Sequence, residues 1–221
     1  MATDKAIFLD FSNTITTVES ENRSISDWLD LVAKKYHIGG EIHRNFGKMR
    51  MEKLIDREKN FRTFMEINRE VLHELYGLTD ILEEEYYRSH EKGLVLRPDF
   101  VDFMDKVTGR FKVVMVTDAD DLYTKRTLQA LGVTRYFEVI VTAEMARAPK
   151  PDPKIFNFAL RESHNPSRVV FIGDSERRDI EGAKRMNFIT LKMDDDSSKT
   201  AADRTVHNFR EVMDTITELN L

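Results

Sequence analysis

The feature that most constrains the fold is an alternation of short apolar runs with amphipathic stretches between residues 98 and 219. Runs rich in β-branched and aromatic residues, typical of strands, precede stretches whose apolar residues recur at three- and four-residue steps, typical of helices. Strands are expected at 5–11, 111–117, 139–141, 169–172 and 189–191, with a short last strand near Val206. Helices are expected from residue 100 and over 123–131, 154–161, 179–186 and 208–219. Repeated strand–helix units predict an α/β fold with a doubly wound parallel sheet and right-handed crossovers.

The stretch 17–92 differs from the rest of the chain. It is rich in charged residues, has no proline, and repeats its apolar residues at helical spacing, which predicts four or five helices. Ser24 or Ser26 is expected to cap the first of them, and Gly77 stands where a helix would end. We therefore predict an all-helical inserted domain at 17–92 and a core domain made of residues 1–16 and 93–221.

The composition narrows the class of protein. With 41% hydrophobic residues the chain can bury a core, and its net charge of −5 argues against non-specific binding of nucleic acid, which needs excess cations. The absence of cysteine excludes disulfides, thiolate metal sites and a cysteine nucleophile. No apolar run approaches the roughly 18 residues of a membrane span and no signal peptide is apparent, so a cytoplasmic protein without a membrane partner is expected. The acidic run at 194–198 is expected to be an exposed loop.

Polar residues stand at the ends of three predicted strands: Asp10, then Thr117 with Asp118, then Asp174. The carboxyl ends of neighbouring parallel strands form one crevice, so these side chains are expected to meet. Asp10 and Asp174 together make a hard oxygen site suited to Mg²⁺. Thr117 offers a hydroxyl, the amides after it can hold a phosphate oxygen, and Lys150 adds a cation. The sequence therefore predicts a site for a metal ion and a phosphate group.

Four segments, in order, resemble the four motifs of the haloacid dehalogenase-like (HAD) hydrolases. The first motif of that family reads D-x-D-x-T, and Asp10-x-Ser12-x-Thr14 resembles it except at Ser12. The other three resemblances lie at 113–118, at 150–156 (pattern K-P-x-P-x-I-F) and at 171–183. The inserted helices resemble the cap of subfamily I. The resemblance implies a Rossmann-like core with a helical cap.

The resemblance also implies roles for these residues. Asp10 would be the nucleophile that forms an aspartyl-phosphate. Mg²⁺ would be held by Asp10, the backbone carbonyl of Ser12, and Asp174. Thr117 and Lys150, with the chain at Asp118, would hold the phosphoryl group. Asp179 would pair with Lys150 or support the metal site.

Ser12 stands where family phosphatases carry the aspartate that protonates the leaving oxygen and then activates water. A serine hydroxyl does not exchange protons near neutral pH, and loss of such a group costs roughly 10²–10⁴-fold for a poor leaving group. We expect a magnesium-dependent hydrolase, a phosphatase acting on a small phosphorylated metabolite, slow or specialised because of Ser12. The alternative is a phosphate-binding or regulatory protein that has lost the catalytic step.

Two further reactions occur in similar enzymes. Dehalogenase-like members lack the magnesium aspartate, whereas this chain keeps Asp174. Phosphonatase-like members carry a small residue at the position of Ser12, as here, but use a cap lysine to form a Schiff base, and Arg50 stands at that place. Cleavage of a C–P bond is therefore the weaker alternative.

Basic residues of the insertion lie around Gly47, among them Lys48 and Arg50. They could form a solvated helix face, or one of them could lean over the site and select an anionic substrate. Lys48 and Arg50 are the candidates for substrate selection.

Overall fold

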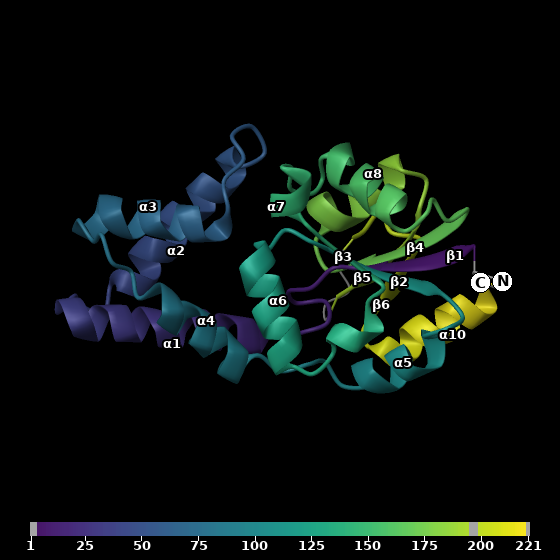
Figure 1. The fold of residues 1–221 in the computed structure, drawn as a ribbon, viewed down its shortest axis with the longest axis horizontal. Coiled ribbons are helices and arrows are strands. Elements are labelled where there is room, and N and C mark those ends of the chain that lie inside the picture. Colours follow the sequence, from purple (N-terminus) through teal and green to yellow (C-terminus); the bar gives the residue numbers. More distant parts are fainter. Residues whose placement is uncertain (1–3, 195–198, 220–221) are drawn as a thin grey trace.

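The computed structural model describes residues 4–194 and 199–219, and its centre is a six-stranded, all-parallel sheet in the order β3-β2-β1-β4-β5-β6 (Figure 1). The predicted α/β class and parallel sheet are confirmed. The strands are β1 (Lys5–Leu9), β2 (Lys112–Thr117), β3 (Val139–Thr142), β4 (Arg168–Gly173), β5 (Ile189–Met193) and β6 (Arg204–Val206). The predicted loop at 194–198 lies almost wholly outside the described residues.

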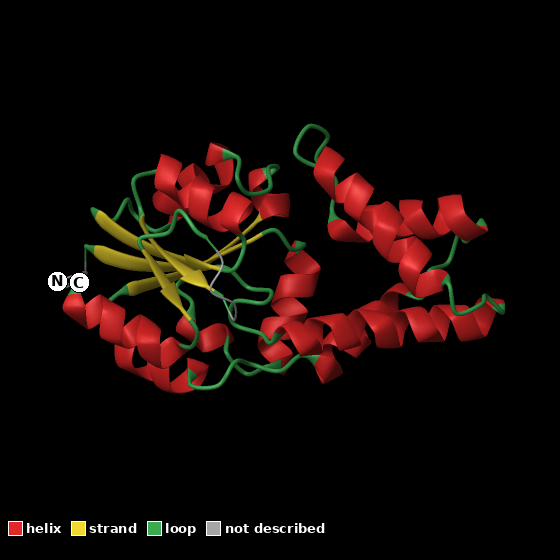
Figure 2. Cartoon of the chain, turned by 180° about the vertical axis from the view of Figure 1, so that it is seen from behind, coloured by secondary structure: helices red, strands yellow, loops and turns green. Residues whose placement is uncertain are grey.

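Helices cover both faces of the sheet, with α5 and α10 on one side and α7 and α8 on the other (Figures 1 and 2). The side chains of β1 explain this layering, because successive residues of a strand point to opposite faces. Ile7 and Leu9 pack in the core beneath α5 and α10, whereas Ala6 and Phe8 pack in the core beneath α8. The helices that accompany the sheet are α5 (Phe100–Val107), α6 (Asp121–Ala130), α7 (Ala143–Ala146), α8 (Pro153–Glu162), α9 (Gly182–Arg185) and α10 (Phe209–Glu218).

Four helices follow β1 in the described chain and extend away from the sheet (Figure 1). They are α1 (Val18–Tyr36), α2 (Ile42–Asp56), α3 (Phe64–Tyr76) and α4 (Glu83–Gly93). They match the insertion expected at 17–92 except that α4 ends one residue later, at Gly93; the division of the insertion from the core as a separate domain stays a prediction. We refer to α1–α4 as the cap. No helix of the described residues is both long enough and apolar enough to span a membrane.

The first cap helix begins earlier than the sequence suggested. Thr17, not Ser24 or Ser26, is the N-cap, and its hydroxyl accepts a hydrogen bond from the Ser20 amide at 3.3 Å. Ser24 lies inside the helix, where its hydroxyl donates to the Ser20 carbonyl at 2.8 Å instead of capping. The predicted end at Gly77 is confirmed, because this residue adopts φ 68° and closes α3.

Another difference lies in the fourth motif, where one helix was expected over 179–186. The chain instead forms a π-helical turn at Glu176–Glu181 and then the short α9. The wider turn follows Ser175, whose hydroxyl caps it by accepting from the Arg178 amide. A π turn of this kind is common at functional sites.

The cap is attached through two neighbouring chain segments. Thr16 and Leu96 form an antiparallel bridge. The Thr17 amide donates to the Val95 carbonyl at 2.9 Å, and the Arg97 amide donates to the Ile15 carbonyl at 2.8 Å. The outgoing and returning segments therefore pair with each other as a short two-stranded ribbon.

The segment that joins α2 to α3, together with the start of α3, also contacts the core. Asp120, just before α6, accepts hydrogen bonds from the amides of Phe64 and Met65 at 2.7 and 2.8 Å, at the start of α3. Glu58 forms a two-point ion pair with Arg177 in the fourth-motif turn. The cap is thus held against the loops that follow β2 and β4.

Candidate active site

The strand order brings the predicted site residues together. β1 lies between β2 and β4, and Leu9 is paired with Met115 on one side and Ile172 on the other. Asp10 continues this pairing by donating its amide to the Ile172 carbonyl at 2.9 Å. The residues that follow these three strands therefore lie at one edge of the sheet, where parallel α/β sheets bind ligands.

Lys150 lies at the centre of the site and is only 2% exposed. Its Nζ donates to Asp10 Oδ1 at 2.5 Å and to Asp179 Oδ1 at 2.6 Å. Its backbone amide donates to Asp118 Oδ1 at 2.8 Å. The contact of Asp179 with Lys150 matches one of the two roles expected for it, and its role in the site stays a prediction. The ammonium group is thus fixed between two buried carboxylates, one of which, that of Asp10, is the expected nucleophile.

Asp174 completes a group of carboxylates. Oxygens of Asp10, Asp174 and Asp179 lie within 4.8 Å of one another, close enough to share a metal ion. Asn13 supports Asp174 by donating its amide to Oδ2 at 3.4 Å. Asp179 is the least available of the three, because its second oxygen accepts from the Ser175 amide at 2.9 Å. Asp10 and Asp174 are therefore the better pair of protein ligands.

Burial and neighbouring charges shift the pKa values of Asp10, Asp174 and Lys150. Burial raises the pKa of Asp10 to about 8; Lys150 works against the rise, while Asp179 and Asp174 add to it. Burial and the neighbouring Asp179 raise the pKa of Asp174 to about 6. Burial disfavours the charge on Lys150, but Asp10 and Asp179 more than offset this and raise its pKa. Burial thus disfavours the charged forms of Asp10 and Asp174, and the cation of Lys150 remains the stable form of that residue.

Glycine is required where the fourth motif passes the site. A Cβ added to Gly173 would lie 2.5 Å from the Cβ of Asp179. This close approach lets the Asp179 side chain fold back over the end of β4 and reach Lys150. Gly173 therefore sets the position of the ion pair.

The two residues at the end of β2 differ in what they can offer a phosphate. Thr117 is buried, and its hydroxyl accepts from the Ala119 amide at 3.1 Å, which leaves its proton available. The carboxylate of Asp118 is instead engaged by the Lys150 amide and, at 3.6 Å, by Arg178. Only the backbone of Asp118 is suited to an anion.

Three residues that the sequence analysis did not assign to the site also lie there. Asn13 takes φ 61°, a left-handed conformation that asparagine tolerates, and reaches Asp174. Thr14, part of the first motif, lies 3.3 Å from Asp10 Oδ2 through its hydroxyl. Glu21, in the first turn of α1, accepts hydrogen bonds from Thr16, two residues after the first motif, and from Tyr123 of α6. The late predicted start of α1 hid this residue, and the acid-rich first turn after Thr17 is the signal that could have revealed it.

The two cap candidates for substrate selection lie in different surroundings. Lys48 is exposed on α2. Arg50 is half-buried, donates through Nε to Asn68 Oδ1 at 2.9 Å, and lies over the Phe64 ring. The amide nitrogen of Asn68 is buried without a hydrogen-bond partner. Of the two, Arg50 is therefore the better candidate for contacting a substrate, because it lies beside Phe64, at the end of α3 that contacts the core.

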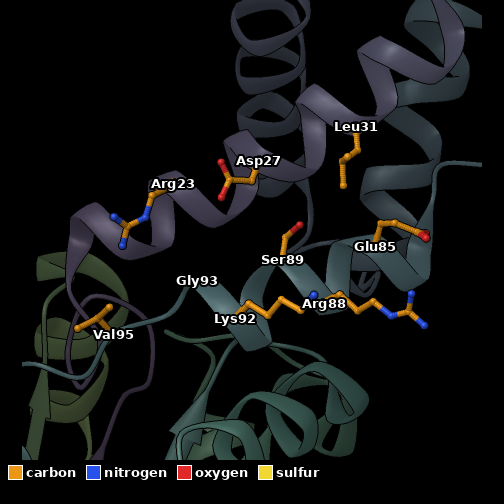
Figure 3. Close-up of a pocket in the computed structure, with 9 residues that line it drawn as sticks. All are labelled: Arg23, Asp27, Leu31, Glu85, Arg88, Ser89, Lys92, Gly93 and Val95. Atoms are coloured by element: carbon orange, nitrogen blue, oxygen red, sulfur yellow. The ribbon is translucent and has the colours of Figure 1, made fainter.

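A groove of about 550 Å³ runs along the outside of the cap between α1 and α4 (Figure 3). Charged side chains of both signs line it, including Arg23, Asp27 and Arg88. None of the candidate site residues lines this groove, so it is separate from the carboxylate cluster.

The chain matches the model of the haloacid dehalogenase-like hydrolases over residues 5–187. Because this match spans most of the sequence, the protein belongs to the haloacid dehalogenase-like hydrolase family. The resemblance inferred from the four motifs is thereby confirmed.

Two relatives of known name align with about half of this chain or less. The chain is 32% identical over 95 residues to the pyrimidine 5'-nucleotidase YjjG of Escherichia coli K12, which is 42% of each protein. It is 31% identical over 122 residues to a glyceraldehyde 3-phosphate phosphatase of Methanopyrus kandleri, which is 49% of this chain and 51% of the relative. The match thus spans about half the length of each of these two curated relatives, or less.

The structure resembles that of the putative HAD-hydrolase YfnB from Bacillus subtilis, which was solved bound to magnesium. The two chains match over 100% of both lengths with a TM-score of 0.80 and 20% sequence identity. At this identity the likeness establishes a shared fold.

Proposed function

We propose that this protein is a magnesium-dependent phosphatase that removes the phosphoryl group of a small phosphorylated metabolite through an aspartyl-phosphate on Asp10. The observation that carries the proposal is the buried Lys150 held between Asp10 and Asp179, next to Asp174. The relatives named as a nucleotidase and as a glyceraldehyde 3-phosphate phosphatase support a small phosphorylated substrate.

The donor set fits a magnesium ion. Mg²⁺ prefers oxygen ligands and is usually bound by one or two carboxylates together with substrate phosphate and water. Asp10 and Asp174 supply those carboxylates, with the backbone carbonyl of Ser12 as the third proposed ligand. Burial, with a smaller contribution from neighbouring carboxylates, raises the pKa of both aspartates, and a divalent cation would favour their charged forms. Bound there, the ion would withdraw charge from the phosphoryl oxygens.

The protein's own groups account for binding and attack. Thr117 and the following amides hold the phosphoryl group, and Lys150 lowers the repulsion between its charge and the Asp10 carboxylate. Lys150 holds Oδ1 of Asp10, while Oδ2 accepts from the Thr14 hydroxyl at 3.3 Å. One oxygen of the nucleophile is thereby fixed in place, which orients the carboxylate for attack on phosphorus.

Ser12 supports a second candidate function. A chain without the family's usual acid/base residue could bind phosphate or phosphoesters without turnover, as a regulatory protein. This alternative predicts magnesium-dependent binding of inorganic phosphate and no phosphate release.

The test is phosphate release from p-nitrophenyl phosphate and from a panel of phosphorylated metabolites, with and without Mg²⁺. The Asp10→Asn variant is the control, because it keeps the shape of the site and removes the nucleophile. Release that requires both Mg²⁺ and Asp10 is the expected result. Release no greater than that of Asp10→Asn would contradict the proposed activity.

A further inference from the structure

The segment 57–64, which joins α2 to the start of α3, contacts three separate loops of the core. Figure 1 shows it in blue on the side of the cap that lies toward α7. Its Glu58 pairs with Arg177 of the π turn, and the amide of Phe64 donates to Asp120 after β2. We call residues 57–64 the bracing segment.

The third contact is made by a phenylalanine. The ring of Phe61 lies beside Arg147, the residue that ends α7, with 5.1 Å between the ring centroid and the guanidinium carbon. Phe61 also packs against the apolar cluster beneath α8, which contains Phe8 of β1 and Phe171 of β4. A loop that only connected two cap helices would not place an aromatic side chain against the core. The bracing segment therefore packs with both parts of the molecule.

Arg57 contacts Phe61 from the cap side. Its side chain is buried, and the guanidinium carbon lies 5.1 Å from the Phe61 centroid and 4.3 Å from the Phe64 centroid. Nε donates to a backbone carbonyl of the same segment, whereas Nη2 has no hydrogen-bond partner in the described structure. The attraction between a guanidinium and an aromatic ring is strongest where water is excluded. Phe61 thus contacts two guanidinium groups, one from the cap and one, that of Arg147, from the core.

The three contact points on the core share one property: each lies three residues along the chain from a candidate site residue. The pairs are Asp120 with Thr117, Arg177 with Asp174, and Arg147 with Lys150. Three residues span at most about 11 Å of chain. A displacement of the bracing segment would therefore reach the hydroxyl, the metal-binding carboxylate and the ammonium group through short stretches of backbone.

We propose that the bracing segment positions Thr117, Lys150 and Asp174 for phosphoryl transfer, with Phe61 as the positioning residue that joins cap to core. The inference rests on the proposed phosphatase activity, but its structural part can be measured without turnover. With the segment seated, the three loops hold their polar groups in one arrangement. With it loosened, the same groups move relative to one another, and attack on phosphorus slows because the rate depends on their alignment.

The first test measures hydrogen exchange of two amides at the site by NMR. The Lys150 amide donates to Asp118, and the Ser175 amide donates to the side chain of Asp179. Phe61→Leu keeps an apolar side chain but removes the ring, so both amides should exchange at least about fivefold faster. The amides of β1 should keep their wild-type rates.

The matched control is Phe158→Leu. Phe158 is also partly buried and lies beside an arginine, Arg161, at 5.2 Å, but both residues belong to α8. This variant should leave the two site amides at their wild-type exchange rates. Exchange that is unchanged in Phe61→Leu, or equally fast in both variants, would overturn the inference.

The second test separates positioning from substrate contact. In Phe61→Leu the kcat for p-nitrophenyl phosphate should fall roughly tenfold while KM stays within about twofold. A side chain that only bound the substrate would instead raise KM and leave kcat unchanged. Phe61→Tyr, which keeps the ring, should retain a kcat within about twofold of wild type; a loss equal to that of Phe61→Leu would overturn the role given to the ring.

The third test asks whether Phe61 and Arg147 act together. Arg147→Gln removes the cation at an exposed position and should speed exchange of the Lys150 amide by roughly threefold. In the Phe61→Leu background the same substitution should add almost nothing, because the ring that it contacts is already absent. Fully additive effects would overturn the contact as the link between cap and core.

The outcomes distinguish this inference from the proposed function. A wild-type protein that releases no phosphate from any substrate overturns the phosphatase and the kinetic part of the inference, while the exchange rates still decide its structural part. Faster exchange of both site amides with unchanged kcat in Phe61→Leu overturns the positioning role and leaves the phosphatase standing.

Discussion

At the scale of single residues, Lys150 is the side chain on which the site most depends. It is the buried cation that contacts both Asp10 and Asp179. Lys150→Met should lower the free energy of unfolding by about 3–5 kcal/mol at neutral pH, because buried carboxylates would lose their compensating charge. Urea denaturation measures this loss.

The matched control for Lys150 is Lys154→Met, at an exposed position of α8. It should change the unfolding free energy by less than about 0.5 kcal/mol. The loss in Lys150→Met should also shrink at pH 5, where Asp174, whose pKa burial raises to about 6, takes up a proton. Equal stability of the two variants would contradict the role given to Lys150.

His90 makes the stability of the fold depend on pH. It is 3% exposed, its Nδ1 lies 2.7 Å from the Tyr86 carbonyl, and burial lowers its pKa to about 4. Because the folded-state pKa is below the ordinary 6.5, the unfolded chain binds the proton more readily. The stability conferred by the neutral imidazole is therefore present above pH 6.5 and is lost as the pH falls toward 4.

The prediction for His90 is a difference between two pH values. Between pH 7.5 and 5 this residue should account for about 2 kcal/mol of lost unfolding free energy. His90→Gln should lose correspondingly less over the same interval, as measured by urea denaturation. The exposed His73→Gln should retain the wild-type dependence; a wild-type dependence in His90→Gln would contradict the assignment.

The residues whose placement could be predicted share one property: they end a strand or directly follow one. Asp10, Thr117 and Asp174 are fixed by the sheet once the strands are recognised. Glu21 could not be predicted in this way, because its place depends on where α1 begins and on how the cap approaches the core. Both depend on tertiary contacts such as that with Tyr123.

At the scale of elements, α3 is joined to the core through its first turn. Asp120 accepts from the free amides of Phe64 and Met65, and burial raises its pKa while these hydrogen bonds pull it back. Asp120→Ala would leave two helix-end donors without their acceptor and should cost about 1–2 kcal/mol. Faster amide hydrogen exchange in the first turn of α3 would report the loosened contact.

The control for this prediction is Asp102→Ala, an exposed acid of α5. It should alter neither the exchange of α3 nor the unfolding free energy by more than about 0.5 kcal/mol. Unchanged exchange in Asp120→Ala would show that α3 is held by its apolar face alone.

The start of a helix could be predicted where a single residue gave a strong signal for it. Pro153 opens α8 and Asn208 caps α10, and both helices begin within a residue of the expected position. The error at α1 arose because three hydroxyl residues compete for the capping role. Thr17 takes that role, while Ser24 bonds back to its own helix. The π turn after Ser175 has no periodicity that a sequence pattern would separate from an ordinary helix.

At the scale of the whole molecule, metal binding should stabilise the fold. A ligand that binds only the folded state at 100 times its dissociation constant adds about 2.7 kcal/mol to the free energy of unfolding. Saturating Mg²⁺ should therefore raise the melting temperature of wild type. The shift should disappear in Asp174→Asn and persist in Asp214→Asn, at an exposed position of α10. Equal shifts in the two variants would place the ion elsewhere.

The paired ribbon at Thr16 and Leu96 has a consequence for how such a protein can change. The chain leaves the core and returns to it at adjacent points, so residues can be added or removed between them at a small cost in loop-closure entropy. A change of sequence or length between these two points would alter the part of the cap that carries Arg50. The ends of β1 and β4, with Asp10 and Asp174, would keep their places in the sheet.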